Sequence, residues 1–178
     1  MRSREMMDAL DHWDRAGIWV YKDKTLRLIF PDETPSAFRN ALTSHCRSGL
    51  LVRITRGLYV NPRARSLPVD ILSALVSFLR PWDDNYLSLE STLSEASWIS
   101  QIPSRLTVMT TGRTQTFETP WGVIEFVHTA RRGEALSEGV VFDERRKLHV
   151  ATPERAWRDL KRVGRNQDLV VPPDTDHA

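Results

Sequence analysis

The sequence predicts an α+β protein in two parts: an N-terminal helical region that ends in a β-hairpin, residues 1–64, and a mixed α/β region, residues 65–165. Apolar residues follow a helical period in the first region, whereas β-prone runs alternate with helical segments in the second. Residues 61–68 carry two prolines and no periodicity, which is typical of a domain junction. Residues 166–178 are expected to form a polar tail, because they offer too little apolar surface for a core.

The net charge changes sign near the same junction. The 178 residues contain 25 Lys+Arg and 23 Asp+Glu, a net charge of +2. Residues 1–66 hold 12 of the basic and 7 of the acidic residues, a net charge of +5, which leaves −3 for residues 67–178. Because each Lys or Arg beside a phosphate releases condensed counterions, the first region suits a polyanionic partner. The acidic remainder argues against DNA wrapping the whole molecule.

The first region is predicted to begin with two helices and a short β-prone run. One apolar stripe indicates a helix over residues 3–15. The β-prone residues 18–21 follow, and then a short helix over residues 25–30, which Pro31 stops. The stripe of the first helix consists of Met6, Met7, Leu10 and Trp13.

A third helix and a hairpin complete this region. Thr34 can cap free amide groups and Pro35 suits the first helical position, so a helix is expected over residues 35–48, with Gly49 as its stop. Two β-prone runs around Thr-Arg-Gly predict a hairpin over residues 50–60.

The second region is predicted to hold three helices and five strands. Helices are expected over residues 69–79 and 89–98, and a third begins at Thr152, which repeats the capping pattern. Turn residues separate the β-prone runs. The predicted strands are 105–111, 114–118, 122–129, 140–143 and 147–151.

One face of helix 35–48 is the main candidate for binding. At about 100° per residue, five polar side chains cluster around one direction of this helix, and no carboxylate interrupts them. Such side chains can hydrogen-bond base edges and phosphates in a DNA major groove. By composition alone, the same face could be the solvated side of a surface helix. The five residues are Ser36, Arg39, Asn40, Thr43 and Arg47.

The order of elements favours binding over simple solvation. The predicted order is that of a winged helix-turn-helix domain: a helix, a short helix, a turn, a polar-faced helix and a basic hairpin. In such a domain the second helix of the helix-turn-helix pair enters the DNA groove. Basic residues on either side of that helix would contact phosphates and fix the register, although each is also typical of an ordinary solubilising charge. These flanking residues are Lys22, Lys24, Arg27, Arg53 and Arg56.

Other chemistry has little support in the sequence. Cys46 is the single cysteine, which fits a reducing, cytoplasmic location and excludes an intramolecular disulfide. The histidines are scattered, and the glycines form no phosphate-binding motif, so we expect no metal and no cofactor. We also expect no membrane span, because no apolar run is long enough.

A magnesium-dependent nuclease is the enzyme alternative. Carboxylates can gather Mg²⁺, but no acidic pair with a nearby lysine lies on a convincing strand, so we expect no enzymatic activity. A winged helix used as a protein-interaction module is a further alternative, since the fold alone does not decide the function. The carboxylates in question are Glu90, Glu95, Glu125 and Asp143.

Several segments resemble the AbiEi-type antitoxins of type IV toxin-antitoxin systems. The hairpin segment 49–62, Gly-Leu-Leu-Val-Arg-Ile-Thr-Arg-Gly-Leu-Tyr-Val-Asn-Pro, is similar to the wing of that family. Residues 86–93, 101–103, 122–128 and 151–159 follow in the family's order, so the resemblance spans nearly the whole chain.

The resemblance implies an N-terminal winged helix that represses its own operon by binding promoter repeats. It also implies a C-terminal domain that counters a nucleotidyltransferase-like toxin without a stable complex, in phage defence. Many such proteins continue with further helices after the segment that matches residues 152–159, whereas this sequence soon turns polar. A relative shortened in this way could repress its operon without neutralising a toxin.

Overall fold

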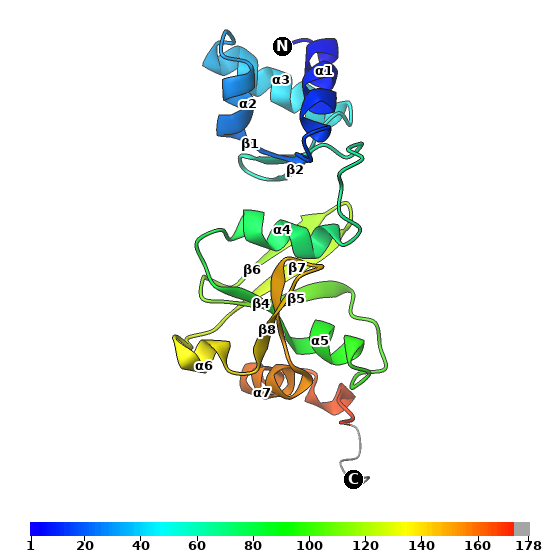
Figure 1. Cartoon of the computed structure of the whole chain (residues 1–178), viewed down its shortest axis with the longest axis vertical. Helices are drawn as coiled ribbons and strands as arrows, with labels where there is room; N and C mark the ends of the chain where they lie inside the picture. Colours follow the sequence, from blue (N-terminus) through cyan, green and yellow to red (C-terminus); the bar gives the residue numbers. More distant parts are fainter. Residues whose placement is uncertain (173–178) are drawn as a thin grey trace. The chain divides into compact units, whose positions relative to one another are not determined.

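The computed structural model describes residues 1–172 and divides into two units, unit 1 from Met1 to Val69 and unit 2 from Asp70 onward (Figure 1). This division falls a few residues after the junction at residue 64 that the sequence indicates. Asp14 explains the difference, because its carboxylate accepts hydrogen bonds from the backbone N–H groups of Arg65, at 2.8 Å, and Ser66, at 3.0 Å. These bonds hold the start of the junction against unit 1.

Unit 1 contains the three helices and the hairpin that the sequence predicts. Thr34 caps α3, as expected, by accepting a hydrogen bond from the N–H of Ala37 at 3.3 Å. The three strands form an antiparallel sheet in the order β1-β3-β2, in which Val60 of the central strand pairs with both Val20 and Val52. The elements are α1 (Ser3–Asp14), β1 (Val20–Lys22), α2 (Asp23–Ile29), α3 (Pro35–Arg47), β2 (Val52–Thr55) and β3 (Leu58–Val60).

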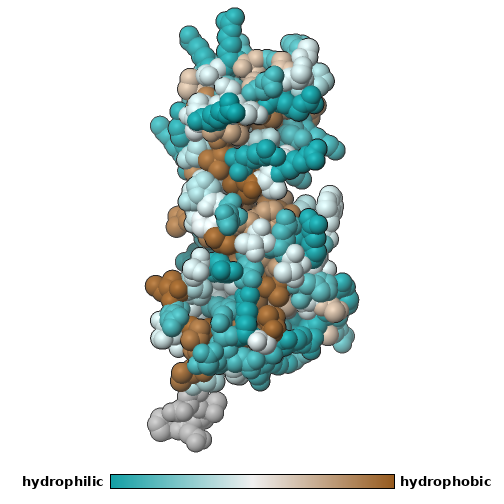
Figure 2. Space-filling model, turned by 180° about the vertical axis from the view of Figure 1, so that it is seen from behind, coloured by the Kyte–Doolittle hydropathy of each residue, from teal (hydrophilic) through white to brown (hydrophobic). Residues whose placement is uncertain are grey.

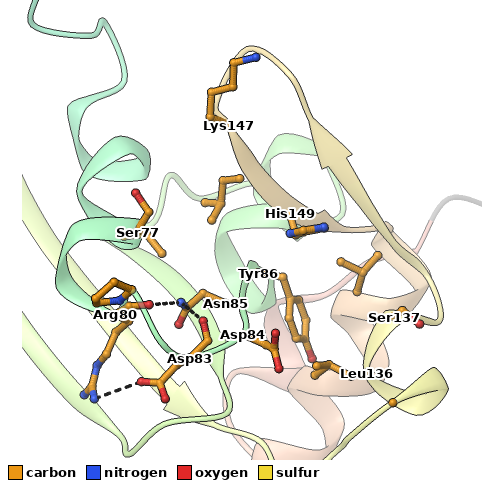
Figure 3. A pocket seen from close by; sticks show the side chains of 15 residues that line it. Ser77, Arg80, Asp83, Asp84, Asn85, Tyr86, Leu136, Ser137, Lys147 and His149 are labelled. Carbon is orange, nitrogen blue, oxygen red and sulfur yellow. Dashed lines mark hydrogen bonds and ion pairs between the residues drawn. The ribbon is translucent and has the colours of Figure 1, made fainter.

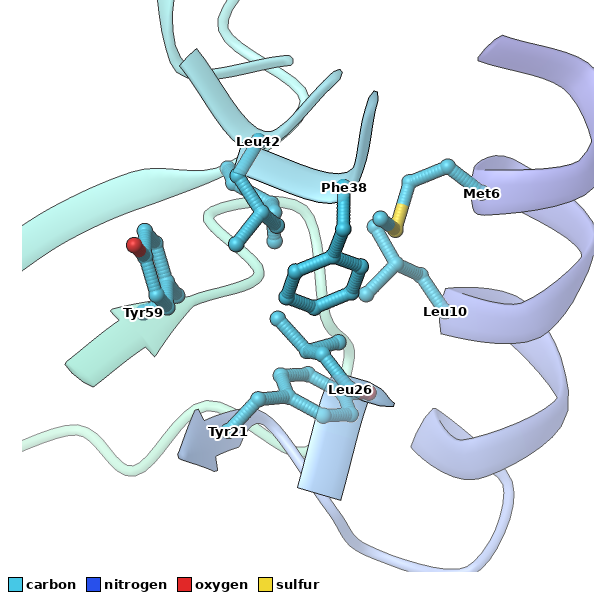
Figure 4. Packing of buried hydrophobic residues seen from close by; sticks show 8 residues of the cluster. Met6, Leu10, Tyr21, Leu26, Phe38, Leu42 and Tyr59 are labelled. Carbon is cyan, nitrogen blue, oxygen red and sulfur yellow. The ribbon is translucent and has the colours of Figure 1, made fainter. Parts of the chain in front are cut away.

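The core of unit 1 lies between the three helices and the sheet. Figure 4 shows Met6 and Leu10 of α1 on one side of Phe38, with Tyr59 of β3 on the other. Tyr21 is also buried and donates a hydrogen bond to the carbonyl of Ile18 at 2.9 Å, and burial raises its pKa to about 12. The apolar stripes predicted from the sequence therefore face a common core.

Unit 2 is a mixed six-stranded sheet with helices on both faces. The elements are α4 (Ile71–Leu79), β4 (Asn85–Leu87), α5 (Leu89–Glu95), β5 (Arg105–Thr110), β6 (Gln115–Thr119), β7 (Gly122–His128), α6 (Glu134–Ser137), β8 (Val140–Asp143), β9 (Leu148–Ala151), α7 (Pro153–Val163) and the 3₁₀ turn η1 (Gln167–Leu169). The strand order is β6-β7-β5-β4-β9-β8, with parallel pairs β5–β7 and β4–β9. Helix α4 covers one face, and α5 and α7 pack together on the other (Figure 1).

A buried polar network joins α7 to the sheet. The Asp159 carboxylate accepts hydrogen bonds from the hydroxyl groups of Tyr86 and Ser88, both at 3.0 Å. Arg155, which is fully buried, donates to the same carboxylate and to the Tyr86 hydroxyl oxygen, and Arg131 pairs with Asp159 at 3.0 Å. Every charge in this network has a partner, as buried charges require.

The structure differs from the sequence-based expectations in several places. Strand β4 is absent from the predicted elements, as is the short α6. Helix α5 ends at Glu95 instead of reaching residue 98, because the chain turns at Ser97 with a φ of 63°. The expected polar tail packs in part: Asn166 donates to Glu90 at 2.7 Å, and Val170 forms a β-bridge with Ile99. Residues 173–178 of the predicted tail lie outside the described residues.

Candidate nucleic-acid interface

The polar face of α3 is fully presented to solvent. The opposite side of this helix is buried through Phe38, Leu42 and His45. Burial lowers the pKa of His45, which keeps its ring uncharged near neutral pH on the core side. The five candidate side chains on the outer face are all exposed: Ser36, Arg39, Asn40, Thr43 and Arg47.

A groove of about 910 Å³ runs beside this face, between α2, α3 and the β2–β3 hairpin. It brings together six of the ten residues proposed from the sequence, namely Lys24, Arg27, Arg39, Thr43, Arg53 and Arg56. The wall also contains one acidic residue, Asp23. Because five basic residues outweigh this one negative charge, the groove is strongly positive. The sequence pattern did not identify Asp23, Leu28 or Tyr59 as wall residues, because their positions follow from the packing of α2 against the hairpin.

The other four proposed residues lie outside the groove. Lys22 ends β1 and is exposed. Ser36 lies in the first turn of α3, where its hydroxyl is 3.3 Å from that of Thr34. Asn40 is exposed on α3, and Arg47 lines a smaller hollow of about 280 Å³ with Thr43 and Arg53. Nine of the ten residues therefore lie in one groove or on the polar edge of α3 beside it, and Lys22 lies apart from them at the end of β1.

The basic side chains of unit 1 are not paired with carboxylates. Within the described residues, no Lys or Arg of residues 1–66 forms an ion pair with a carboxylate, and the side chains of Arg39, Arg47 and Arg56 make no hydrogen bond. The Arg53 side chain donates only to the carbonyl of Thr55, at 3.4 Å. In unit 2, by contrast, most arginines are paired with carboxylates: Arg80, Arg105, Arg131, Arg146, Arg155, Arg158 and Arg165.

Two contacts fix the shape of the groove. The guanidinium carbon of Arg27 lies 5.1 Å from the centre of the Phe38 ring, which holds this side chain between α2 and α3. At the hairpin, the N–H of Asp23 donates to the carbonyl of Gly57 at 3.0 Å. Gly57 has a φ of 79°, a conformation that favours glycine, so the tip that carries Arg56 is anchored to the start of α2.

The carboxylates considered for a nuclease are occupied by arginines. Arg165 donates to both oxygens of Glu90 and to both oxygens of Glu125, at 2.8–3.0 Å. Hydrogen bonds from Arg165 lower the pKa of Glu125. Arg146 in turn holds Glu95, at 2.8 Å, and lies 4.0 Å from Asp143. A divalent cation at Glu90 and Glu125 would have to displace Arg165.

Comparisons with known proteins add no assignment. The sequence matches no model of a known protein family and no curated protein. Within residues 1–172, no three His, Cys, Asp or Glu side chains gather as ligands for a metal ion. No helix in that part of the chain is long and apolar enough to cross a membrane.

Proposed function

We propose that unit 1 is a winged helix-turn-helix domain and that the protein belongs to the class of regulators that bind double-stranded DNA. Helices α2 and α3 would form the helix pair, and the β2–β3 hairpin would be the wing. In this class, the second helix of the pair lies in the major groove. The exposed polar face of α3 and the basic groove beside it support this assignment.

The side chains of α3 suit base recognition, and those around it suit phosphate contacts. Arg39 and Asn40 carry the groups that pair with guanine and adenine edges. Arg53 and Arg56 on the hairpin and Lys24 on α2 would contact the backbone and fix the register. The observation that carries the proposal is the set of three guanidinium groups around one groove, those of Arg39, Arg53 and Arg56, none of which forms an ion pair with a carboxylate among the described residues.

A salt titration tests this function. We expect the full chain to bind the DNA upstream of its own gene, with an affinity that falls steeply as salt rises, because bound phosphates release counterions. Replacing Arg56 by Ala should reduce the slope of log K against log salt by about 1 and weaken specific and random duplexes alike. Fluorescence anisotropy of labelled duplexes measures both. If no duplex binds even at low salt, unit 1 is a protein-interaction module instead.

Within this class, we propose the more particular identity of an AbiEi-type antitoxin of a type IV toxin-antitoxin system. It would repress its own operon and counter a nucleotidyltransferase-like toxin. The support is the resemblance of the hairpin segment and of the segments around Tyr86 and Asp159, two residues that also share the buried hydrogen bond of unit 2. An adjacent reading frame that encodes no nucleotidyltransferase would count against this identity while leaving the DNA-binding function open.

A further inference from the structure

Unit 2 carries a group of arginines that the proposed DNA-binding function does not use. It lies where α7 meets the segment that leads into α6, and Figure 1 shows both helices at the same end of the unit. Residues 131–138 and α7 together hold six basic and four acidic residues, a net charge of +2, although residues 67–178 as a whole carry −3. Figure 2 shows a band of hydrophilic residues across this end of unit 2. We call Arg131, Arg155, Arg158 and Arg162 the arginine cluster.

Arg131 shares its carboxylate partner with Arg155. The Nη1 of Arg131 lies 3.0 Å from Oδ1 of Asp159, and the Nε of Arg155 lies 3.2 Å from the same oxygen. Two hydroxyl groups also donate to this carboxylate. Burial lowers the pKa of Arg131; Asp159 opposes this, and the positive charges of Arg155 and Arg162 lower it further. One carboxylate therefore neutralises the positive charge at this point only in part.

Arg155 fixes the geometry of the cluster without offering a donor to a ligand. It is fully buried and donates to the Tyr86 hydroxyl oxygen at 3.0 Å and to the carbonyl of Leu136 at 3.3 Å. Figure 3 shows Tyr86 and Leu136 side by side at the α6 turn. Its Nη1 donates to two further carbonyls of that turn, and its Nε donates to Asp159. Arg155 thus holds the segment around α6 in place against α7.

The donors that remain belong to Arg131 and Arg162. The Arg131 side chain forms its ion pair with Asp159 and no other hydrogen bond among the described residues, and none of its nitrogens is both buried and unpaired, so solvent reaches its free N–H groups. Arg162 is exposed and has no hydrogen-bond or ion-pair partner in that part of the chain. Arg158 lies one helical turn before it and pairs with Glu138 at 2.9 Å. Like charges four residues apart repel on a helix, so an anion at Arg162 would relieve this repulsion.

We propose that the arginine cluster binds a compact diphosphate group, with one phosphoryl group on Arg131 and the other on Arg162. A guanidinium presents paired N–H groups that match a phosphate in a bidentate way, and such charge-assisted hydrogen bonds are strong. The net charge of +2 is local, and the rest of unit 2 is acidic, so an extended polyanion would be repelled beyond the cluster. The inference is independent of the DNA-binding function proposed for unit 1.

Pyrophosphate is the first probe, added to the full chain in a buffer without divalent cations. We expect it to bind with a Kd of about 1 mM, as is usual for so small a ligand, and to shift the backbone amide signals of Arg131 and Arg162 in ¹H–¹⁵N spectra. Sulfate offers one anionic group instead of two and should bind at least about tenfold more weakly at the same ionic strength. Adenosine diphosphate carries the diphosphate on an organic body: affinity equal to that of pyrophosphate supports a free diphosphate as the ligand, and tighter binding supports a carried one.

Substitutions at exposed arginines make the test specific. Arg162→Gln should weaken pyrophosphate about tenfold, and Arg162→Glu should abolish detectable binding, because it places a carboxylate beside the anion. The control is Arg145→Gln, which makes the same charge change on the exposed β8–β9 turn, at an arginine without an ion pair among the described residues, and should leave binding unchanged. Equal binding of pyrophosphate and sulfate, equal losses in Arg162→Gln and Arg145→Gln, or no shift at either arginine would overturn the proposal.

Duplex DNA is the competing ligand for a basic surface. If Arg162→Gln weakens a duplex while pyrophosphate shifts neither Arg131 nor Arg162, the cluster is a nucleic-acid contact and the diphosphate proposal is wrong. Arg56→Ala separates this result from the function of unit 1, because it should weaken DNA binding and leave pyrophosphate binding unchanged.

Discussion

The arginines of this protein differ in what surrounds their guanidinium groups. In unit 2, Arg155 and Arg165 are saturated by carboxylates, hydroxyl oxygens and carbonyls, so they hold elements together. In unit 1, Arg39 and Arg56 are exposed and unpaired in the described structure. A free guanidinium loses little on meeting a phosphate or a guanine, because no internal ion pair has to break first. The presence or absence of an internal partner therefore distinguishes the arginines that hold unit 2 together from those proposed to bind DNA.

Arg39 is the residue at which base recognition can be tested. Arg39→Ala should weaken binding to the specific duplex by about 1–3 kcal/mol and relax the base preference at one position. The change should barely affect random DNA, because the lost contact is to a base edge. Fluorescence anisotropy with duplexes that each differ from the specific DNA site at one base pair measures both the loss in affinity and the change in base preference.

The matched control is Arg4→Ala, which removes an equally exposed arginine from α1, outside the groove wall. It should leave the base preference intact. If the two variants behave alike, α3 does not read bases and the face is a solvated surface.

At the scale of elements, Arg165 and its two carboxylate partners join three separate pieces of unit 2. Glu90 belongs to α5, Glu125 to β7, and Arg165 follows α7. Because Arg165 depresses the pKa of Glu125 below its ordinary 4.5, the folded state favours the charged carboxylate. The resulting stabilisation is complete above pH 4.5 and is lost as the pH falls through the lower pKa of the folded state.

Glu125→Gln should therefore destabilise the protein in a pH-dependent way. We expect a loss of about 1.5–3 kcal/mol in the free energy of unfolding near pH 7, the usual range for a hydrogen bond to a charged group. The difference from the native protein should shrink below pH 4.5. Urea unfolding at a series of pH values measures it. Glu118→Gln, at an exposed position of β6 whose side chain makes no hydrogen bond or ion pair among the described residues, should show neither effect.

The elements that the sequence predicts correctly are those with local signals. Thr34 and Thr152 both cap their helices as predicted, and each is followed by proline. The hairpin also follows from local pattern, since Thr-Arg-Gly lies between two β-prone runs and Gly57 takes the left-handed conformation. The exposure of the polar face of α3 follows from helical geometry.

The features that the sequence does not predict depend on distant partners. Strand β4 has three residues, yet it is central in the sheet, because it pairs with β5 on one side and with β9 on the other. Leu89, which follows it, has a φ of 59° although it is fully buried, and no local pattern indicates this conformation. The described part of the expected tail likewise depends on Glu90 and Ile99, more than 70 residues earlier.

At the scale of the whole molecule, each unit has a hydrophobic core of its own. The first core includes Leu10 and Phe38, and the second includes Tyr86 and Leu93. The units also differ in charge, since the region before the junction is basic and the rest acidic. A phosphate backbone bound by unit 1 would therefore stabilise one core directly and leave the other unchanged.

Separate cores predict two unfolding transitions in calorimetry. Leu42→Ala, in the core of unit 1, should lower only one of them, because it removes about 2–5 kcal/mol of packing from that unit. Specific DNA at about 100 times its Kd should raise the same transition, by about 2.7 kcal/mol of stabilisation, and leave the other where it was. Leu93→Ala in unit 2 is the reciprocal control and should lower the transition that DNA does not move. If there is a single transition, and Leu42→Ala, Leu93→Ala and bound DNA all shift it, the two units unfold as one. If DNA raises the transition that Leu93→Ala lowers, the binding surface lies in unit 2.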